Sequence, residues 1–283
     1  MKPLLANVEE VFREAAARWT LIAYFVLSSL FILLFSSAVN LDIVDGALAG
    51  IELFGNEAQF GPDVSLESLV MTFESGFSAI IFLVSVFLAV FATAHLVPRL
   101  QDKGTVDLYL SRPVGRIPAL LYRYIAGLML AGINVVYLIG SIWIILGWKT
   151  GVFHLRFLAS GLVIMLVIAV LLAFTFLIGT VTSSTGVSIM SSYALYFITV
   201  ILSAHDKISA AVSSKVTANI IDGLYWTLPK LVELQGATIA LVAAGQAPEE
   251  VEKFLTVSPF VTSSAFGLVC LTLACIHFSR KEF

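Results

Sequence analysis

The segment Asp102–Arg116, with the sequence DKGTVDLYLSRPVGR, is a short charged stretch between two long runs that carry no charge. Ser75–Pro98 precedes it without a single Lys, Arg, Asp or Glu, and Tyr124–Trp148 follows it in the same way. Each run exceeds the ~20 apolar residues that a helix needs to cross a bilayer. The segment is therefore predicted to connect two membrane spans at one surface, where its charged side chains can meet water or another protein.

The residue types in this segment suit docking more than catalysis. Apolar residues interleave with Asp107 over about two helical turns, and Pro113 then ends the predicted helix because its ring cannot continue one. The candidate docking residues are Lys103, Gly104, Thr105, Asp107, Arg112, Pro113 and Arg116. A second interpretation stays open, in which the segment is a solvated loop whose arginines only set the topology.

Motifs that carry out chemistry are missing from the rest of the chain. There is no Gly-x-x-x-x-Gly-Lys-Ser/Thr loop to bind ATP phosphates and no His-Glu-x-x-His motif. The predicted spans hold no Asp, Glu, Lys or Arg in their central portions, which disfavours an ion-coupled carrier. The four histidines, His95, His154, His205 and His277, are scattered over different spans and make an incomplete ligand set. We therefore expect no catalytic residue, no metal site and no cofactor in this chain.

Mild polar residues do occur within the predicted spans. They are Asn134, Ser188, Ser191, Ser192 and Tyr196. Small and hydroxyl side chains let helices approach closely and hydrogen-bond to one another. Two interpretations stay open for this set: plain helix packing or dimer contact, and the lining of a translocation path.

The composition is that of an integral membrane protein. Of the 283 residues, 59% are hydrophobic and 12% charged, and the mean hydropathy is +0.99. Soluble domains carry about 25% charged residues. We expect an all-α membrane protein with six transmembrane helices in one domain, residues 1–283.

Uncharged runs and turn-forming residues set the expected boundaries. The spans are predicted at residues 19–41, 75–98, 118–148, 157–179, 187–203 and 255–279. Residues 4–18 have helical periodicity and are predicted to form an amphipathic interfacial helix. The loop 206–253 is expected to contain short helices that cap or enter the outer face, and a coupling helix is expected between the second and third spans.

Loop charges predict the orientation. Asp42–Glu74 has seven acidic residues and no basic one. With both termini in the cytoplasm, the inner side carries a net charge of +4 and the outer side −7. This agrees with the positive-inside rule and predicts a multi-pass protein of the inner (cytoplasmic) membrane. No dense basic patch supports nucleic-acid binding.

Three short motifs resemble those of a known family. GTVDLYLSRPVGR looks like the cytoplasmic segment of type-2 ABC exporter permeases, and the closing FSRKEF resembles the ending of the same family. LYWTLPKLVEL is similar to its outer-loop segment. The nearest branch in pattern is that of multicopper-enzyme-maturation and nitrous-oxide-reductase accessory permeases. Gln101–Asp102–Lys103 departs from the family pattern, in which an acidic residue is common before the Gly-Thr pair.

The resemblance implies a division of labour between subunits. Such a permease forms a homodimer or pairs with a related permease, and each copy docks a separate ABC ATPase that holds the ATP and Mg²⁺. A periplasmic or accessory protein is a further partner that the resemblance leaves open, as is the substrate. The rival functions are an ATP-independent carrier or channel, and a membrane scaffold or integral enzyme.

The predicted topology can be tested by cysteine accessibility. Asp63→Cys and Gln246→Cys should react with an impermeant thiol reagent added outside intact cells, whereas Thr105→Cys should react only after permeabilisation. This follows from the loop charges. Reaction of Thr105→Cys from outside would overturn the orientation.

Overall fold

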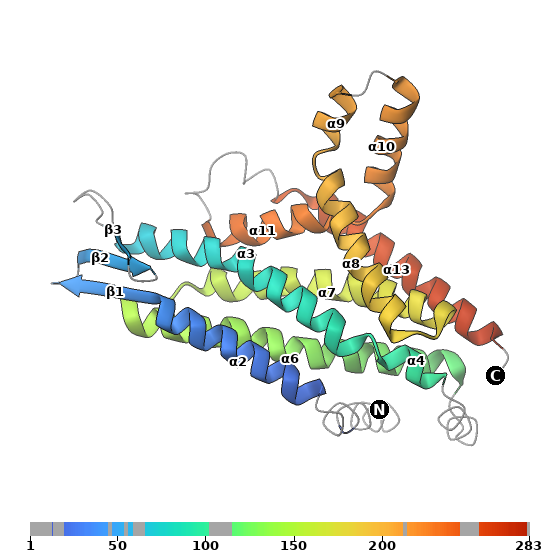
Figure 1. The fold of residues 1–283 in the computed structure, drawn as a ribbon, viewed down its shortest axis with the longest axis horizontal. Coiled ribbons are helices and arrows are strands. Elements are labelled where there is room, and N and C mark those ends of the chain that lie inside the picture. The colour runs from blue at the N-terminus through green and yellow to red at the C-terminus, as the bar shows by residue number, and fades with distance from the viewer. Residues whose placement is uncertain are drawn as a thin grey trace.

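The computed structural model describes residues 13, 20–44, 47–53, 56–58, 66–101, 115–211, 214–243 and 255–281. Long helices lie side by side along the longest dimension of the molecule (Figure 1). The helices are α2 (Thr20–Ala38), α3 (Leu66–Thr93), α4 (Leu96–Leu100), α6 (Arg116–Thr150), α7 (Leu155–Thr182), α8 (Thr185–Leu202), α9 (His205–Ala211), α10 (Lys215–Thr227), α11 (Leu231–Ala243) and α13 (Val257–Arg280). The amphipathic helix predicted at residues 4–18 falls outside the described residues, apart from Arg13.

Five of the helical segments described are long and apolar enough to cross a membrane. They are Val70–Leu100, Arg116–Thr150, Leu155–Thr182, Thr185–Leu202 and Val257–Arg280. Each overlaps one of the predicted spans. The apolar part of α2, Ile22–Ser37, is shorter, so the first of the six spans stays a prediction.

The first predicted loop contains three short strands, and the other described elements are helices, as the all-α expectation requires. β1 (Val39–Val44), β2 (Ala47–Leu53) and β3 (Asn56–Ala58) form an antiparallel sheet in the order β1–β2–β3. The sequence signal is the alternation of apolar and polar residues in Val39–Ile43, which has the period of a strand. This alternation is hard to recognise in the sequence because the apolar run of the first predicted span continues directly into β1.

Helix α7 is the central helix of the bundle. It packs against α3, α6, α8, α11 and α13. Its sequence, LRFLASGLVIMLVIAVLLAFTFLIGTVT, has no charged residue beyond Arg156, as expected for a helix inside a membrane bundle. Phe157, Ile164 and Phe176 are fully buried on it.

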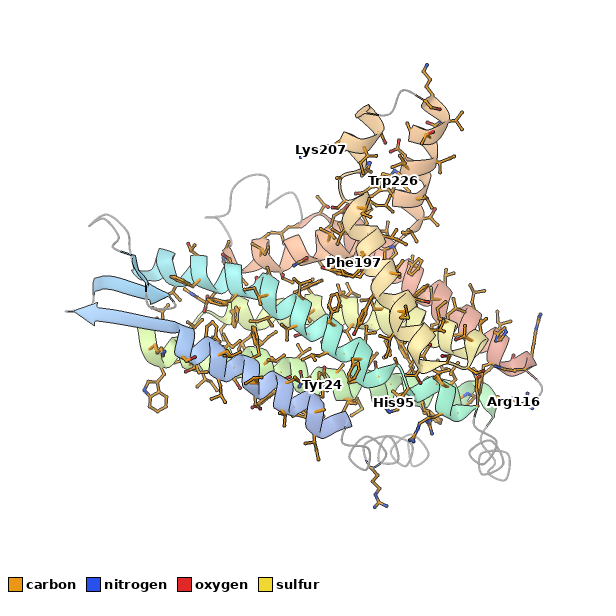
Figure 2. All side chains as sticks on the ribbon, viewed as in Figure 1. Tyr24, His95, Arg116, Phe197, Lys207 and Trp226 are labelled. Atoms are coloured by element: carbon orange, nitrogen blue, oxygen red, sulfur yellow. The ribbon has the colours of Figure 1, made fainter. Side chains whose placement is uncertain are left out.

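The chain bends between α3 and α4. Pro98 has no amide hydrogen, so the carbonyl of Ala94 loses the donor that would continue the helix. The backbone resumes with the bond from Arg99 N to the carbonyl of His95. The resulting elbow at Ala94–His95 directs the short α4 toward the end of α7, which it contacts; Figure 2 labels His95 there.

Three helices, α9, α10 and α11, lie between α8 and α13 in the chain, and they occupy two different positions. α9 and α10 pack on each other and project away from the bundle (Figure 1). α11 runs along α3 and α7 and buries Leu231, Leu234 and Ala237 against them. At 13 residues α11 is too short to cross a bilayer. Its contacts with α3 and α7 place it alongside these two helices.

Helices α7 and α13 lie close together at Gly267. A Cβ atom placed there would lie 3.3 Å from Cα of Val170. The backbone of α7 cannot move aside as a flexible side chain can. A small residue at position 267 is therefore a condition of this packing.

We expect Gly267→Leu to force α7 and α13 apart and to destabilise the purified protein by about 1–3 kcal/mol, the usual cost of overpacking. Gly140→Leu is the matched control, because nothing lies within 4 Å of a Cβ at Gly140. Thermal unfolding of both variants in the same detergent measures the difference. Equal melting temperatures for the two variants would contradict this packing.

Candidate functional site at the Lys281 end

The candidate docking segment begins and ends at one end of the bundle. There α4 ends, α6 begins, and α7 and α13 both terminate; we call this the Lys281 end. Six of the proposed docking residues lie outside the described residues: Lys103, Gly104, Thr105, Asp107, Arg112 and Pro113. Arg116 is described, and Figure 2 shows it at the start of α6, close to the end of the chain. The site is built from the residues that flank the segment.

Arg116 binds the carboxyl end of α13. Its Nη1 donates to the carbonyl of Lys281 at 2.7 Å and more weakly to that of Ser279 at 3.4 Å. The last carbonyls of a helix have no partner within the helix and carry the negative end of its dipole. The guanidinium of Arg116 donates hydrogen bonds to these carbonyls and its positive charge faces the negative end of the dipole. These bonds hold the first turn of α6 against the end of α13.

Gln101 binds the carboxyl end of α7 in the same manner. Its Nε2 donates to the carbonyls of Gly179 and Thr180 at 3.4 and 3.2 Å. Its Oε1 accepts from Lys281 Nζ at 2.7 Å and from the Ser183 hydroxyl. Both halves of the amide are therefore used, and the residue directly before the docking segment is fixed to α7.

Lys281 joins the two caps. Its Nζ also donates to the carbonyl of Thr180 at 3.0 Å and to Ser183 Oγ at 2.8 Å. Partial burial lowers the pKa of the Lys281 amino group below its ordinary value, because desolvation disfavours the charged form. Three oxygen acceptors compensate for the lost water. Gln101, just before the docking segment, and Arg116, its last residue, thus both contact Lys281.

Helix α4 is held from two further sides. Arg123 on α6 is fully buried, and its Nη1 donates to the carbonyl of Leu96 at 3.0 Å. A Cβ atom at Gly179 would lie 3.1 Å from Cβ of Val97, so α4 and α7 touch closely there. Arg123 is an ionisable residue within a span helix, near its end. α4 is thereby fixed to both α6 and α7.

A family model described as ABC-2 family transporter protein matches residues 11–283. The chain belongs to this family. It is the membrane-spanning permease subunit of an ABC transporter. A comparison with curated proteins finds no match.

The polar span residues of the permease mostly pack inside the subunit. Asn134, Ser188, Ser192 and Tyr196 are buried, and Ser191 is partly exposed. Asn134 Nδ2 donates to Ser28 Oγ at 2.9 Å, and Tyr196 donates to Gln235 Oε1 at 3.2 Å. Ser192 Oγ lies 2.8 Å from Thr175 Oγ1. These contacts link helices; a role in translocation or in a dimer interface stays a prediction.

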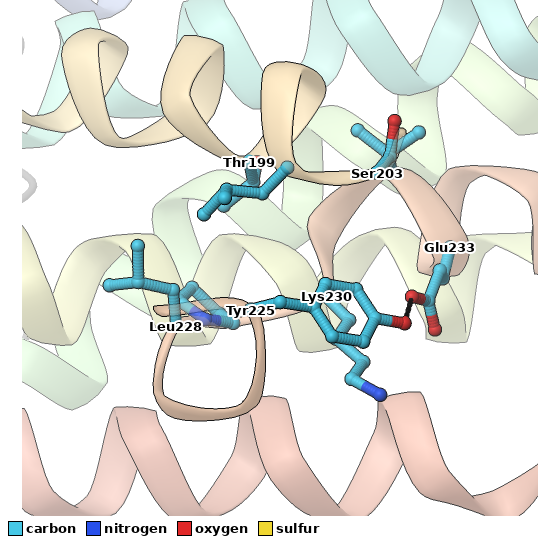
Figure 3. A pocket seen from close by; sticks show the side chains of 9 residues that line it. Thr199, Ser203, Tyr225, Leu228, Lys230 and Glu233 are labelled. Carbon is cyan, nitrogen blue, oxygen red and sulfur yellow. Dashed lines mark hydrogen bonds between the residues drawn. The ribbon is translucent and has the colours of Figure 1, made fainter. Parts of the chain in front are cut away.

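A second polar cluster lies where α10 meets α11 (Figure 3). Lys230 is only 6% exposed, with its Nζ 4.3 Å from the ring centre of Tyr225 and 4.1 Å from that of Trp226. Tyr225 donates to Glu233, and burial together with this carboxylate raises the pKa of the Tyr225 hydroxyl. The cavity here has a volume of about 10 Å³, room for about one water molecule. The cluster fixes the turn before α11.

A buried acid lies at the opposite end of the bundle. Glu74, in the first half of α3, is 1% exposed, and its Oε2 is 2.8 Å from Nδ1 of His154. The predicted second span starts at Ser75, one residue after Glu74, so the sequence places Glu74 in the loop before the span. The structure makes it part of the span helix. The contact ties the start of the α7 segment to α3.

Three residues of the Lys281 end were missed as site residues: Gln101, Arg123 and Lys281. Lys281 belongs to the recognised ending FSRKEF, which gave a signal but no role. The only sequence signal at Gln101 was its position directly before the docking segment. Arg123 was noted as a charge inside an apolar run, and a buried partner for it was the missing inference.

We expect Lys281→Met to lower the thermal stability of the permease by about 1–2 kcal/mol, the scale of a lost charge-assisted hydrogen-bond set. For a chain of this size that is a shift of about 3–6 °C in melting temperature. Lys215→Met is the matched control, since Lys215 is an exposed lysine on α10 and makes none of these contacts. An equal shift in both variants would show that the Lys281 contacts contribute nothing specific.

Proposed function

We propose that this permease couples ATP hydrolysis by a separate ATPase subunit to the export of a substrate, and that Asp102–Arg116 is the segment through which the two subunits are coupled. The observation that carries the proposal is the pair of caps at the Lys281 end. Gln101, just before the segment, is hydrogen-bonded to the carboxyl end of α7, and Arg116, its last residue, to the carboxyl end of α13. A force applied to the segment therefore has a direct connection to the bundle.

The mechanical argument follows from the two flanks. On one side, α4 meets α3 at the Ala94–His95 elbow, so a displacement of α4 can change its angle to α3. On the other side, α6 is a continuous helix of 35 residues. Such a helix is about 52 Å long and moves as a stiff rod. ATP-driven closure of the partner would then tilt the second and third spans.

The proposal includes further partners. A second copy of this chain or a related permease would complete the transporter, with the substrate moving along the interface between them. The direction is taken as export because the motifs resemble exporter permeases. Asn134, Ser188, Ser191, Ser192 and Tyr196 remain candidates for contacts that change during transport. The ATP and Mg²⁺ would be held by the ATPase alone.

Exchange of the charges in the segment tests the docking claim. Asp107→Lys combined with Arg112→Glu should abolish copurification of the partner ATPase, because mispaired interface charges cost several kcal/mol. The variant should still insert and keep its melting temperature. Arg156→Glu combined with Asp206→Lys is the control, with the same exchange of charges on α7 and α9. Undiminished copurification with the segment variant would remove the docking claim.

Purified without a partner, the permease should hydrolyse no ATP above background. Activity should appear on coexpression with the ATPase and disappear when the phosphate-binding lysine of that ATPase is replaced. Robust hydrolysis by the isolated permease would show that the proposed division between the subunits is wrong.

A further inference from the structure

A groove runs between α7 and α13 at the Lys281 end. Its volume is about 400 Å³, far larger than the cavity near Lys230. Its apolar walls are Leu177 and Val181 on α7 and Leu273 and Ile276 on α13. Val181, Leu273 and Ile276 are 53%, 48% and 43% exposed, so the groove is open along the side of the bundle. It has the character of a site for an extended apolar chain.

Nitrogen-bearing side chains line the same groove where α13 ends. His277 and Arg280 lie one helical turn apart, and both are exposed. Neither donates a hydrogen bond to another described residue. Lys281 also lines the groove, but its ammonium is engaged with Gln101, Thr180 and Ser183. Among the residues that the structure describes, the lining contains no Asp or Glu. A guanidinium and an imidazole are thus available to an anion from outside.

A simpler explanation accounts for part of this arrangement. Cations near a helix carboxyl end are stabilised by the helix dipole, and Arg280 and His277 occupy the last turn of α13. That explanation covers their place on the helix. It does not account for the apolar groove beside them, whose described lining combines apolar walls with cationic side chains at one end. Apolar walls with cationic side chains at one end match a molecule with an acyl chain and a negative head.

We propose that this groove binds an anionic phospholipid, with one acyl chain between α7 and α13 and the phosphate against Arg280 and His277. The Lys281 end is the predicted cytoplasmic surface, where the leaflet is rich in anionic lipids and each cationic side chain contributes about 1 kcal/mol of attraction. Because the groove ends at Lys281, the bound lipid would contact the cap that holds Gln101 and Arg116. The proposal rests on the membrane topology and not on ATPase coupling, so the two can fail separately.

Native mass spectrometry of the purified full-length permease tests the charge requirement. Dioleoyl phosphatidylglycerol and dioleoyl phosphatidylcholine are titrated separately into the delipidated protein in detergent. The phosphatidylglycerol should bind more tightly, and Arg280→Ala should weaken it by about fivefold, the equivalent of one surface cation. Lys215→Ala, which removes an exposed cation on α10, is the matched control and should bind as the unaltered protein does.

The apolar part of the groove needs its own variant. Leu273→Trp should fill the groove and reduce phosphatidylglycerol binding while the melting temperature is kept. Leu268→Trp is the control, because Leu268 is exposed on the same helix outside the groove lining. Reduced binding in Leu273→Trp alone supports the proposal, and equal losses in both variants overturn it.

Three other results would also overturn the proposal. Equal binding of the two lipids would show that no anionic head is recognised. Full competition by millimolar glycerol 3-phosphate would show a phosphate site without a role for the acyl chain. Dissociation of a permease dimer by Leu273→Trp, with lipid binding unchanged, would show that a second copy occupies the groove. Arg280→Ala lies on the surface, so its result stands even if the tryptophan variant fails to fold.

Discussion

The unsatisfied carbonyls at the carboxyl ends of α7 and α13 determine how the Lys281 end is built. In a bundle of apolar helices these carbonyls are among the few strong acceptors, and leaving them unpaired in partly buried surroundings costs free energy. Gln101, Arg116 and Lys281 supply the donors. Because these donors come from α4, from α6 and from the end of the chain, satisfying two helix ends also fixes the flanks of the segment between α4 and α6.

The same logic operates inside the bundle, where apolar packing alone specifies helix positions poorly. Lipid tails are as apolar as leucine, so close packing and hydrogen bonds must select the neighbours. The Asn134–Ser28 pair joins α6 to α2, and the bond from Arg123 to Leu96 joins α6 to α4. Gly267 lets α13 approach α7 closely. Each contact contributes modestly, about 1 kcal/mol for an interhelical hydrogen bond, but each removes alternative arrangements.

The two ends of the bundle differ in what their polar groups do. At the Lys281 end the polar side chains hold the flanks of a segment that is predicted to receive a partner, beside an open groove. At the other end Glu74 and His154 are buried together and link α3 to the start of α7. Near α11, Lys230 lies over two aromatic rings in a site with almost no free volume. Of these three described sites, the Lys281 end is the one that lies beside an open groove.

The sequence by itself determined the class of protein and the places of the helices. Long uncharged runs can be stable only as membrane helices, and their limits agree with those of the helices to within a few residues, except where α3 extends back over Glu74 and Leu66. Strand β1 was hidden because its alternation continues an apolar run. The contacts among Gln101, Arg116 and Lys281 could not be found in this way, since Gln101 and Lys281 are 180 residues apart and no sequence pattern pairs them. Only the packing of α4 and α13 on α7 brings them together, because a helix-end carbonyl can be satisfied by any donor that the fold places there.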